Sequence, residues 1–246
     1  MINYLNSERY RLFHKKSLYF TSAFFLLVMV IIAVMYRNSN EAFLSTSALY
    51  YLSTLIVTTA ISFFIIVLFN SFLTGKDNEL LKQAISFGVT RNTIFLSKLV
   101  LTLVIFLFLF GLNILTIVLL GENLFTTDPQ VLNDFLIAVS NLLPLLISAF
   151  TFGHLLRMLG VSQIVTILSM LFVYGLSNEV AGFIFSLVSK HEPISQFFPS
   201  ALLADAVNDF FNHTVAVQPA SWVISGGLIV LYIAIGLRVF GQKNIE

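Results

Sequence analysis

Apolar residues along this chain fall into long runs separated by short polar segments. Six of the runs are predicted to form membrane-spanning helices, each of which needs about 20 mostly apolar residues; the fifth run is short and could extend past the polar residues 177–179 to Val188. The predicted spans are residues 17–36, 49–73, 92–120, 131–156, 161–176 and 221–240. None of the runs alternates apolar and polar positions as membrane barrel strands do. The pattern therefore predicts an all-α integral membrane protein with a single transmembrane domain over residues 1–246.

Three other segments have the pattern of helices that do not cross the bilayer. Residues 1–16 mix basic residues with apolar ones near helical spacing, which predicts an elbow helix on the membrane surface, with a disordered basic flank as the alternative. Residues 78–87 carry an apolar stripe, with Gly88 as a helix stop and Thr90 as the cap of the third span. Residues 177–220 carry a second amphipathic repeat after Pro199, which predicts an outer re-entrant helical hairpin.

The composition favours lipid as the surrounding solvent. Apolar residues make up 58% of the chain and charged residues 10%, against about half and a quarter in soluble domains. The chain has no cysteine, which excludes disulfides, thiolate catalysis and cysteine-based metal sites.

Charge sets the expected orientation, because cytoplasmic loops of membrane proteins carry an excess of Lys and Arg. With six spans, both termini share one side of the membrane. That side holds Arg9, Arg11, Lys15, Lys16, Lys76, Lys82, Arg91, Lys98, Arg157, Arg238 and Lys243. The other side holds only Arg37 and Lys190. We therefore expect a multi-pass protein of a bacterial plasma membrane with both termini in the cytoplasm.

The sequence offers little chemistry of its own. It contains no H-E-x-x-H, G-x-S-x-G or phosphate-binding G-x-x-x-x-G-K-[ST] motif. We therefore expect no catalytic residue, no metal site, no bound cofactor and no nucleic-acid partner. Four polar residues in or near the spans are candidates either for hydrogen bonds between helices or for the lining of a path: Asn70, Asn113, Asn141 and Glu179.

The helix expected over residues 78–87 is too short to be stable alone. Its apolar stripe needs a surface to rest on, which is lipid, the protein's own bundle or a partner. If the chain moves a substrate, nearly uncharged spans argue against coupling to an ion gradient, and this segment is where a partner would deliver energy.

Three stretches carry a resemblance to a known family. Residues 7–12 followed by 15–19 resemble the entry segment of type-2 ABC transporter permeases. Residues 79–91 with Ile94 and Lys98 resemble the first cytoplasmic loop of that family, with the pattern G-[VM]-[ST]-R-x-x-[IL]-x-x-x-K. Residues 197–200 and the helix after them resemble its outer re-entrant segment. The similarity extends over the whole chain as a layout, and it is nearest to lantibiotic-immunity permeases and exporters of cytolytic peptides such as phenol-soluble modulins.

The resemblance implies a permease subunit that pairs with a cytoplasmic ATPase, which binds ATP and magnesium, and with a second, identical or paralogous permease. Residues 78–87 are then the coupling helix. The residues expected at its ATPase interface are Glu79, Lys82, Gln83, Ile85, Phe87 and Arg91. The expected cargo is an amphipathic peptide or a lipid-like molecule, on a path along spans one, two and five, in contact with membrane lipids. The main alternative is a membrane anchor or sensor that binds peptide and signals to a partner without transport; an intramembrane enzyme and a plain scaffold are further alternatives.

Overall fold

The computed structural model describes residues 2–38, 46–58, 60–74, 78–125, 129–188 and 195–242. Within these ranges all regular structure is helical, and no strand occurs. The elements are α1 (Ile2–Phe13), α2 (Lys16–Asn38), α3 (Thr46–Thr58), α4 (Ala60–Thr74), α5 (Asn78–Ser86), α6 (Arg91–Leu124), α7 (Pro129–Met158), α8 (Gln163–Met170), the π-helical turn η1 (Leu171–Gly175), α9 (Ser177–Val188), the 3-10 turn η2 (Ser195–Phe197), α10 (Pro199–Phe211) and α11 (Pro219–Gln242). The prediction of an all-α chain is confirmed.

Four helices, α2, α6, α7 and α11, are long and apolar enough to cross a membrane. Two bent pairs also have this character: Leu49–Val57 with Ile61–Phe72, inclined at 58°, and Gln163–Gly175 with Ser177–Ile184, inclined at 62°. The described part of the chain therefore has four candidate spans, or up to six if each bent pair is one span. This is the pattern of a multi-pass membrane protein.

The bent pairs differ from the expected spans. The sequence predicts one helix over residues 49–73, and the structure divides this range between α3 and α4. The fifth predicted span ends near the π-helical turn η1, and α9 continues in a new direction. Ser200 of α10 stabilises this second bend, because its hydroxyl oxygen accepts the Asn178 N–H at 2.7 Å and lies 3.0 Å from the Ser177 hydroxyl. The first turn of α9 is thus capped by a side chain from outside the helix.

Helix α7 is the centre of the bundle. It contacts α3, α4, α6, α8, α10 and α11, and it continues as a helix through Pro144. The main core lies along α4, α6 and α7 and includes Ile66, Phe95 and Phe150, all fully buried. A smaller core joins α3, the far end of α6, the start of α7 and α10 around Tyr50 and Phe210.

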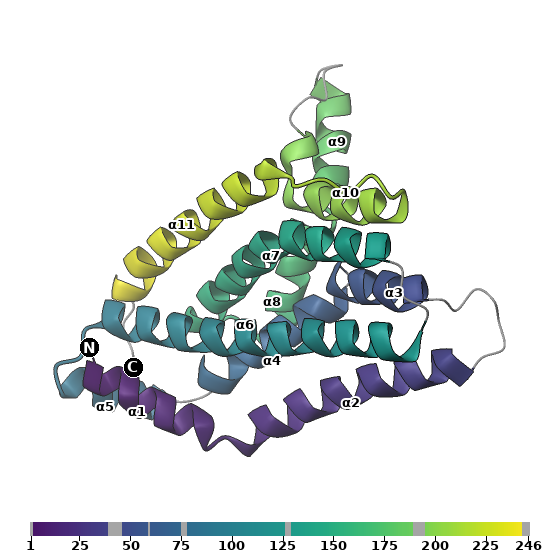
Figure 1. Ribbon diagram of the computed structural model, residues 1–246. Helices are drawn as coiled ribbons and strands as arrows, with labels where there is room; N and C mark the ends of the chain where they lie inside the picture. The colour runs from purple at the N-terminus through teal and green to yellow at the C-terminus, as the bar shows by residue number, and fades with distance from the viewer. Residues whose placement is uncertain are drawn as a thin grey trace.

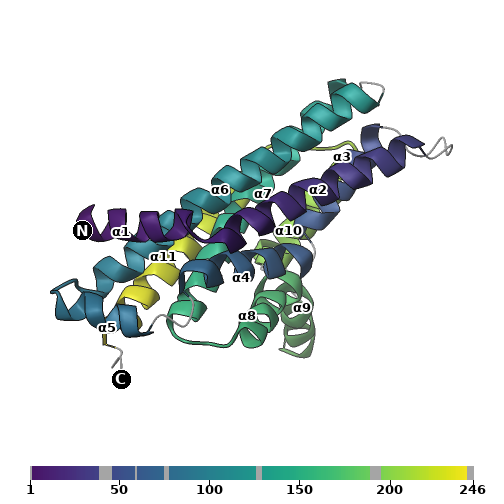
Figure 2. The ribbon, with the colours of Figure 1, turned by 90° about the horizontal axis from the view of Figure 1, so that it is seen from below.

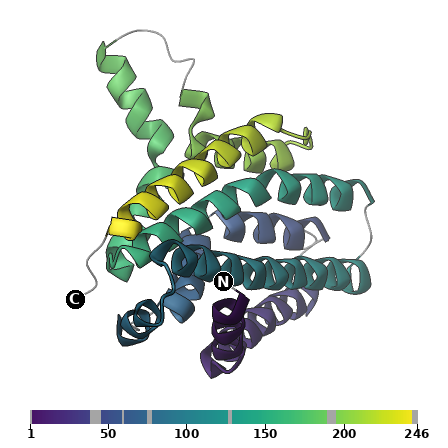
Figure 3. The ribbon, with the colours of Figure 1, turned by 90° about the vertical axis from the view of Figure 1, so that its left-hand side faces the viewer.

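Both termini lie at one end of the molecule. Figure 1 shows α1, α5 and the last turn of α11 together there, and Figure 2 shows α2 running alongside α6 away from them. Figure 3 shows α9 standing clear of the other helices. We call the region formed by α5, the first turns of α6 and the last turn of α11 the terminal corner. It contains the residues that the sequence marks as an interface.

Candidate functional site

The helix α5 ends as its sequence predicts. Gly88 adopts a φ of +82°, which favours glycine. The Gly88 N–H donates to the carbonyl of Ile85 at 2.9 Å, and the Val89 N–H donates to the carbonyl of Ala84 at 3.1 Å. These two bonds form a Schellman motif, which ends the helix and turns the chain toward α6. The predicted stop is therefore confirmed.

Thr90 caps the next helix, also as predicted. Its hydroxyl oxygen accepts the Thr93 N–H at 3.3 Å, and α6 begins at Arg91. The stop at Gly88 and the cap at Thr90 leave only a short link between α5 and α6. Both helix ends are fixed by hydrogen bonds, so the corner between them has a defined shape.

The two faces of α5 have different surroundings. Leu81, Ala84 and Ile85 are partly buried and pack against the main core. Lys82 and Gln83 are exposed, and Phe87, just after the helix, is 80% exposed. The side chain of Glu79 lies outside the described residues. Of the predicted interface residues, Lys82, Gln83 and Phe87 thus face outward, whereas Ile85 helps to seat α5 on its own bundle.

Arg91 has a partner within the chain. Its Nη1 donates to the carbonyl oxygen of Gly241 at 3.1 Å, which joins the start of α6 to the last turn of α11. Beside this contact lies an open groove of about 530 Å³. Its lining residues are Ile85, Val89, Thr90, Arg91, Asn92, Leu237, Arg238, Gly241 and Gln242. The groove is lined by the apolar side chains of Ile85, Val89 and Leu237 and by two arginines, and the exposed Phe87 lies between Ile85 and Val89 in the sequence.

A buried ion pair joins α1 to the terminal corner. Lys98 of α6 is 1% exposed, and its Nζ lies 3.9 Å from Oε1 of Glu8. The same carboxylate accepts the Tyr4 hydroxyl at 3.0 Å and the Arg11 Nη2 at 2.6 Å. Lys15, just after α1, donates to the Phe72 carbonyl of α4. The predicted elbow helix is therefore fastened to the bundle by charge, a contact that the sequence analysis missed although Lys98 stands out within an apolar run.

Asn70 belongs to a polar contact inside the bundle. It is fully buried, and its Nδ2 donates to the Phe150 carbonyl at 3.3 Å. Its Oδ1 lies 3.2 Å from Nδ1 of His154, whose Nε2 lies 3.3 Å from the Phe95 carbonyl oxygen. These bonds join α4, α7 and α6. They show Asn70 as a residue that holds helices together, one of the two roles that the sequence left open.

The other three polar candidates lie in separate surroundings. Asn141 joins α7 to the segment before α11, as its Nδ2 donates to the Ala216 carbonyl at 2.8 Å and its Oδ1 accepts the Gln218 N–H at 3.0 Å. Asn113 donates within its own helix to Leu109 at 2.8 Å and borders an apolar cavity. Glu179 is exposed in the first turn of α9. The four residues thus do not form one polar path.

We expect Asn141→Leu to lower the free energy of unfolding by about 1–2 kcal/mol, because the Ala216 carbonyl and the Gln218 N–H lose their partner. Thermal unfolding of the purified protein in detergent measures the change. Asn123→Leu is the control, since the Asn123 side chain is exposed and bonds only within its own helix. Equal effects of the two substitutions would contradict the assigned role of Asn141.

A second polar cluster lies at the opposite end of the bundle. His213 has a φ of +54°, unusual for this residue. Its Nδ1 lies 3.6 Å from Oδ2 of the buried Asp134, and its Nε2 lies 3.1 Å from the Tyr51 hydroxyl. Nearby on α10, partial burial and the carboxylate of Asp209 raise the pKa of Asp205. The sequence analysis did not single out this cluster, because its members come from α3, α7 and the α10–α11 connection.

The described residues contain no group of three His, Asp or Glu side chains that could hold a metal ion. The features that the fold assembles at the end where the termini lie are a fixed corner at α5, an exposed aromatic residue at its helix stop, and contacts to this corner from α1 and α11. Comparisons of the chain with family models, with curated proteins and with solved structures gave no match.

Proposed function

We propose that this chain is the permease subunit of an ATP-driven exporter, with six spans and both termini in the cytoplasm. One observation carries the proposal. At the end where the termini lie, α5 keeps Leu81 and Ile85 against the core, while Phe87 beside the helix stop is 80% exposed. An exposed aromatic next to a groove with cationic walls is the kind of anchor that protein partners bind.

The proposed partner is a separate cytoplasmic ATPase, which binds ATP and magnesium. Through the terminal corner, movement of the ATPase is transmitted to the helices of the membrane domain. A force on α5 reaches α6 through the capped link, α11 through Arg91 and Gly241, and α1 through Lys98 and Glu8. Because these helices are packed and hydrogen-bonded to one another, a displacement of α5 moves α1, α6 and α11 together with it. In the proposed transport cycle, this chain therefore converts movement of the ATPase into movement of its own helices.

The proposed path runs between this chain and a second permease. The strongest support for such a path is the outward face of the bent pair α8–α9. Ile164, Leu168 and Phe172 recur at every fourth residue and are all exposed, so one apolar stripe remains uncovered along α8 and η1. Such a face suits an amphipathic peptide or a lipid-like cargo. It can contact the apolar side of the cargo without removing any charged group of the cargo from water.

The change Phe87→Asp should weaken stimulation of the ATPase, because it places a charge where the proposal buries an aromatic ring. Where an ATP-binding-cassette ATPase is encoded next to this chain, it serves as the partner, and the two are co-purified in detergent. We expect the apparent affinity between them to fall about tenfold or more, with ATP hydrolysis measured across a titration. Phe87→Leu should retain most of the association.

Two matched variants make this experiment selective. Phe197→Asp changes an exposed aromatic in η2, away from the terminal corner, and should leave ATPase coupling intact. Ile85→Asp should both uncouple and destabilise, since Ile85 packs on the core of its own chain. If Phe87→Asp binds and stimulates the ATPase as the unchanged protein does, the coupling role of α5 is wrong.

Transport separates the exporter from a sensor that binds peptide without moving it. Inside-out vesicles containing both subunits should accumulate a labelled amphipathic peptide only when ATP is hydrolysed. Peptide binding and ATPase stimulation without accumulation would favour the sensor.

A further inference from the structure

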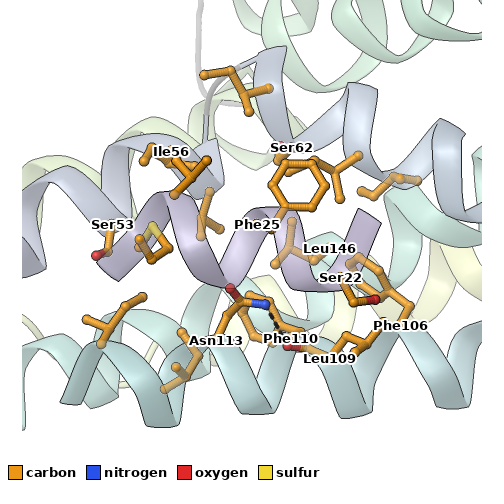
Figure 4. A pocket seen from close by; sticks show the side chains of 18 of the residues that line it. Ser22, Phe25, Ser53, Ile56, Ser62, Phe106, Leu109, Phe110, Asn113 and Leu146 are labelled. Carbon is orange, nitrogen blue, oxygen red and sulfur yellow. Dashed lines mark hydrogen bonds between the residues drawn. The ribbon is translucent and has the colours of Figure 1, made fainter. Parts of the chain in front are cut away.

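An apolar cavity of about 310 Å³ lies among the candidate spans, away from the terminal corner (Figure 4). Side chains of α2, α3, α4 and α6 form its walls, and Leu146 of α7 contributes to them. Figure 4 shows Phe106, Leu109, Phe110 and Asn113 along the α6 wall, with Ser53 and Ser62 across from them. The cavity belongs to none of the contacts used above to couple α5 to the bundle.

The direction change between α3 and α4 explains why a space exists here. Leu49–Val57 and Ile61–Phe72 are inclined at 58°, whereas α2 and α6 each continue as one helix. A bent element packed against straight ones leaves a wedge, and the lining residues Val57 and Ile61 lie on either side of the bend. A void of this size has lost the dispersion contacts that a filled interior would have.

The chemistry of the walls restricts what can fill the wedge. The hydroxyls of Ser22 and Ser53 already donate to Leu18 and Leu49 of their own helices, each at 2.7 Å. The Asn113 amide nitrogen donates to Leu109 at 2.8 Å. The remaining lining side chains are almost all aliphatic or aromatic. Apolar cavities of this kind do not hold stable water, so a molecule that binds here is apolar.

The position of the cavity identifies the source of such a molecule. Two of its walls, α2 and α6, are candidate membrane spans, so their neighbours in a bilayer are lipid tails. The lining residue Ile61 is 51% exposed, so the cavity is not sealed from those neighbours. Its volume is about twice that of an engineered apolar cavity of roughly 150 Å³ that binds benzene.

We propose that this cavity is a binding site for one acyl chain of a membrane phospholipid. The chain fills the wedge between α2 and the α3–α4 bend and packs against Phe110 and Leu146. The lipid headgroup stays outside, because the cavity presents no charged side chain to it. This site requires neither an ATPase nor a cargo, but its walls α2 and α3–α4 are the first two spans that the sequence places along the export path.

Tryptophan fluorescence with bromine-labelled lipid tests the proposal. The chain has a single tryptophan, so Trp222→Phe gives a background to which one new tryptophan is added. Phe110→Trp reports on the cavity, and Phe108→Trp, two residues along α6 at a 64% exposed position, reports on the bulk surroundings. Both purified proteins, depleted of lipid in detergent, are titrated with phosphatidylcholine brominated on one acyl chain.

A bound chain should quench the tryptophan at 110 along a saturating curve, half-complete at about a tenth of the lipid fraction needed at position 108. Ser53→Phe, which fills part of the cavity, should shift the curve for position 110 onto that for position 108. In the protein that keeps Ser53, identical quenching curves for tryptophan at positions 110 and 108 would overturn the proposal. This comparison does not depend on whether Ser53→Phe folds.

A third arm distinguishes lipid from cargo. An amphipathic peptide carrying bromophenylalanine is titrated into the same two proteins. Selective quenching at 110 by this peptide, with none by the lipid, would assign the cavity to the transport path and overturn the lipid site. Selective quenching by lipid alone supports it and leaves the exporter proposal to its own tests.

Discussion

Replacing Glu8 with methionine should lower the melting temperature of the detergent-solubilised protein by about 6–20 °C. The change removes the carboxylate that lies 3.9 Å from the Lys98 ammonium, while that lysine stays 1% exposed inside the bundle. Removing one partner of a buried ion pair costs about 3–5 kcal/mol, because the remaining charge keeps its desolvation penalty. For a chain of this size, each kcal/mol corresponds to about 2–4 °C. Size-exclusion chromatography after heating measures the shift.

A double variant separates the charge effect from packing. Glu8→Met combined with Lys98→Met also removes the buried ammonium and keeps similar volume, while Arg11 still loses its 2.6 Å contact with Glu8, so we expect it to recover part of the lost stability. Glu179→Met makes the same substitution at an exposed position of α9 and should change stability by less than about 0.5 kcal/mol. If the double variant were less stable than Glu8→Met, the contact would not act as a buried pair.

The second large effect is expected at Gly236 of α11. A Cβ at this position would overlap the ring of Phe95, with its Cε2 only 2.8 Å away. That ring cannot move aside easily, because it is fully buried between His154 and Phe240, at centroid distances of 5.1 and 6.1 Å. Gly236→Ala should therefore destabilise the protein by about 3 kcal/mol through overpacking.

The same helix offers a control of opposite sign. Gly227 has no atom within 4 Å of the corresponding Cβ position, so Gly227→Ala should be neutral or should stabilise α11 by up to about 1 kcal/mol. Adding Phe95→Leu to Gly236→Ala should restore part of the loss by making room. Thermal unfolding of the variants in one detergent gives the comparison. Similar losses for both glycines would show that α11 and α6 are not in close contact.

Local features of the terminal corner are predictable from sequence because their causes are local. Gly88 and Thr90 act on the residues directly beside them, through a left-handed backbone and a hydroxyl cap. The membrane character of the helices is equally local, since it depends on the length of an apolar run. The placement of Phe87 outside and Ile85 inside is different, because both are apolar and both are expected at the same partner interface.

The contacts that position the helices lie beyond sequence patterns. Asn70 and His154 meet from 84 residues apart, and each alone is compatible with a path, an interhelical bond or a snorkelling side chain. The bend between α3 and α4 interrupts a run long enough for one span, and the weakly polar Thr58 and Ser62 do not divide that run in two, so hydropathy alone does not show the bend. The cavity follows from that bend and is equally hidden. These features depend on which helices pack together, and one sequence does not determine this by periodicity alone.

The contact between Arg91 and Gly241 spans 150 residues, and this separation sets an order of assembly. Translation proceeds at roughly 5–20 residues per second, so about 8–30 s pass after Arg91 is made before its acceptor exists. Glu8 is already present when Lys98 is synthesised, so α1 and α6 can join first. The groove beside α5 gains its second wall only when α11 inserts. A nascent chain therefore lacks the complete groove, so under the proposed function the ATPase binds only after the last helix has inserted.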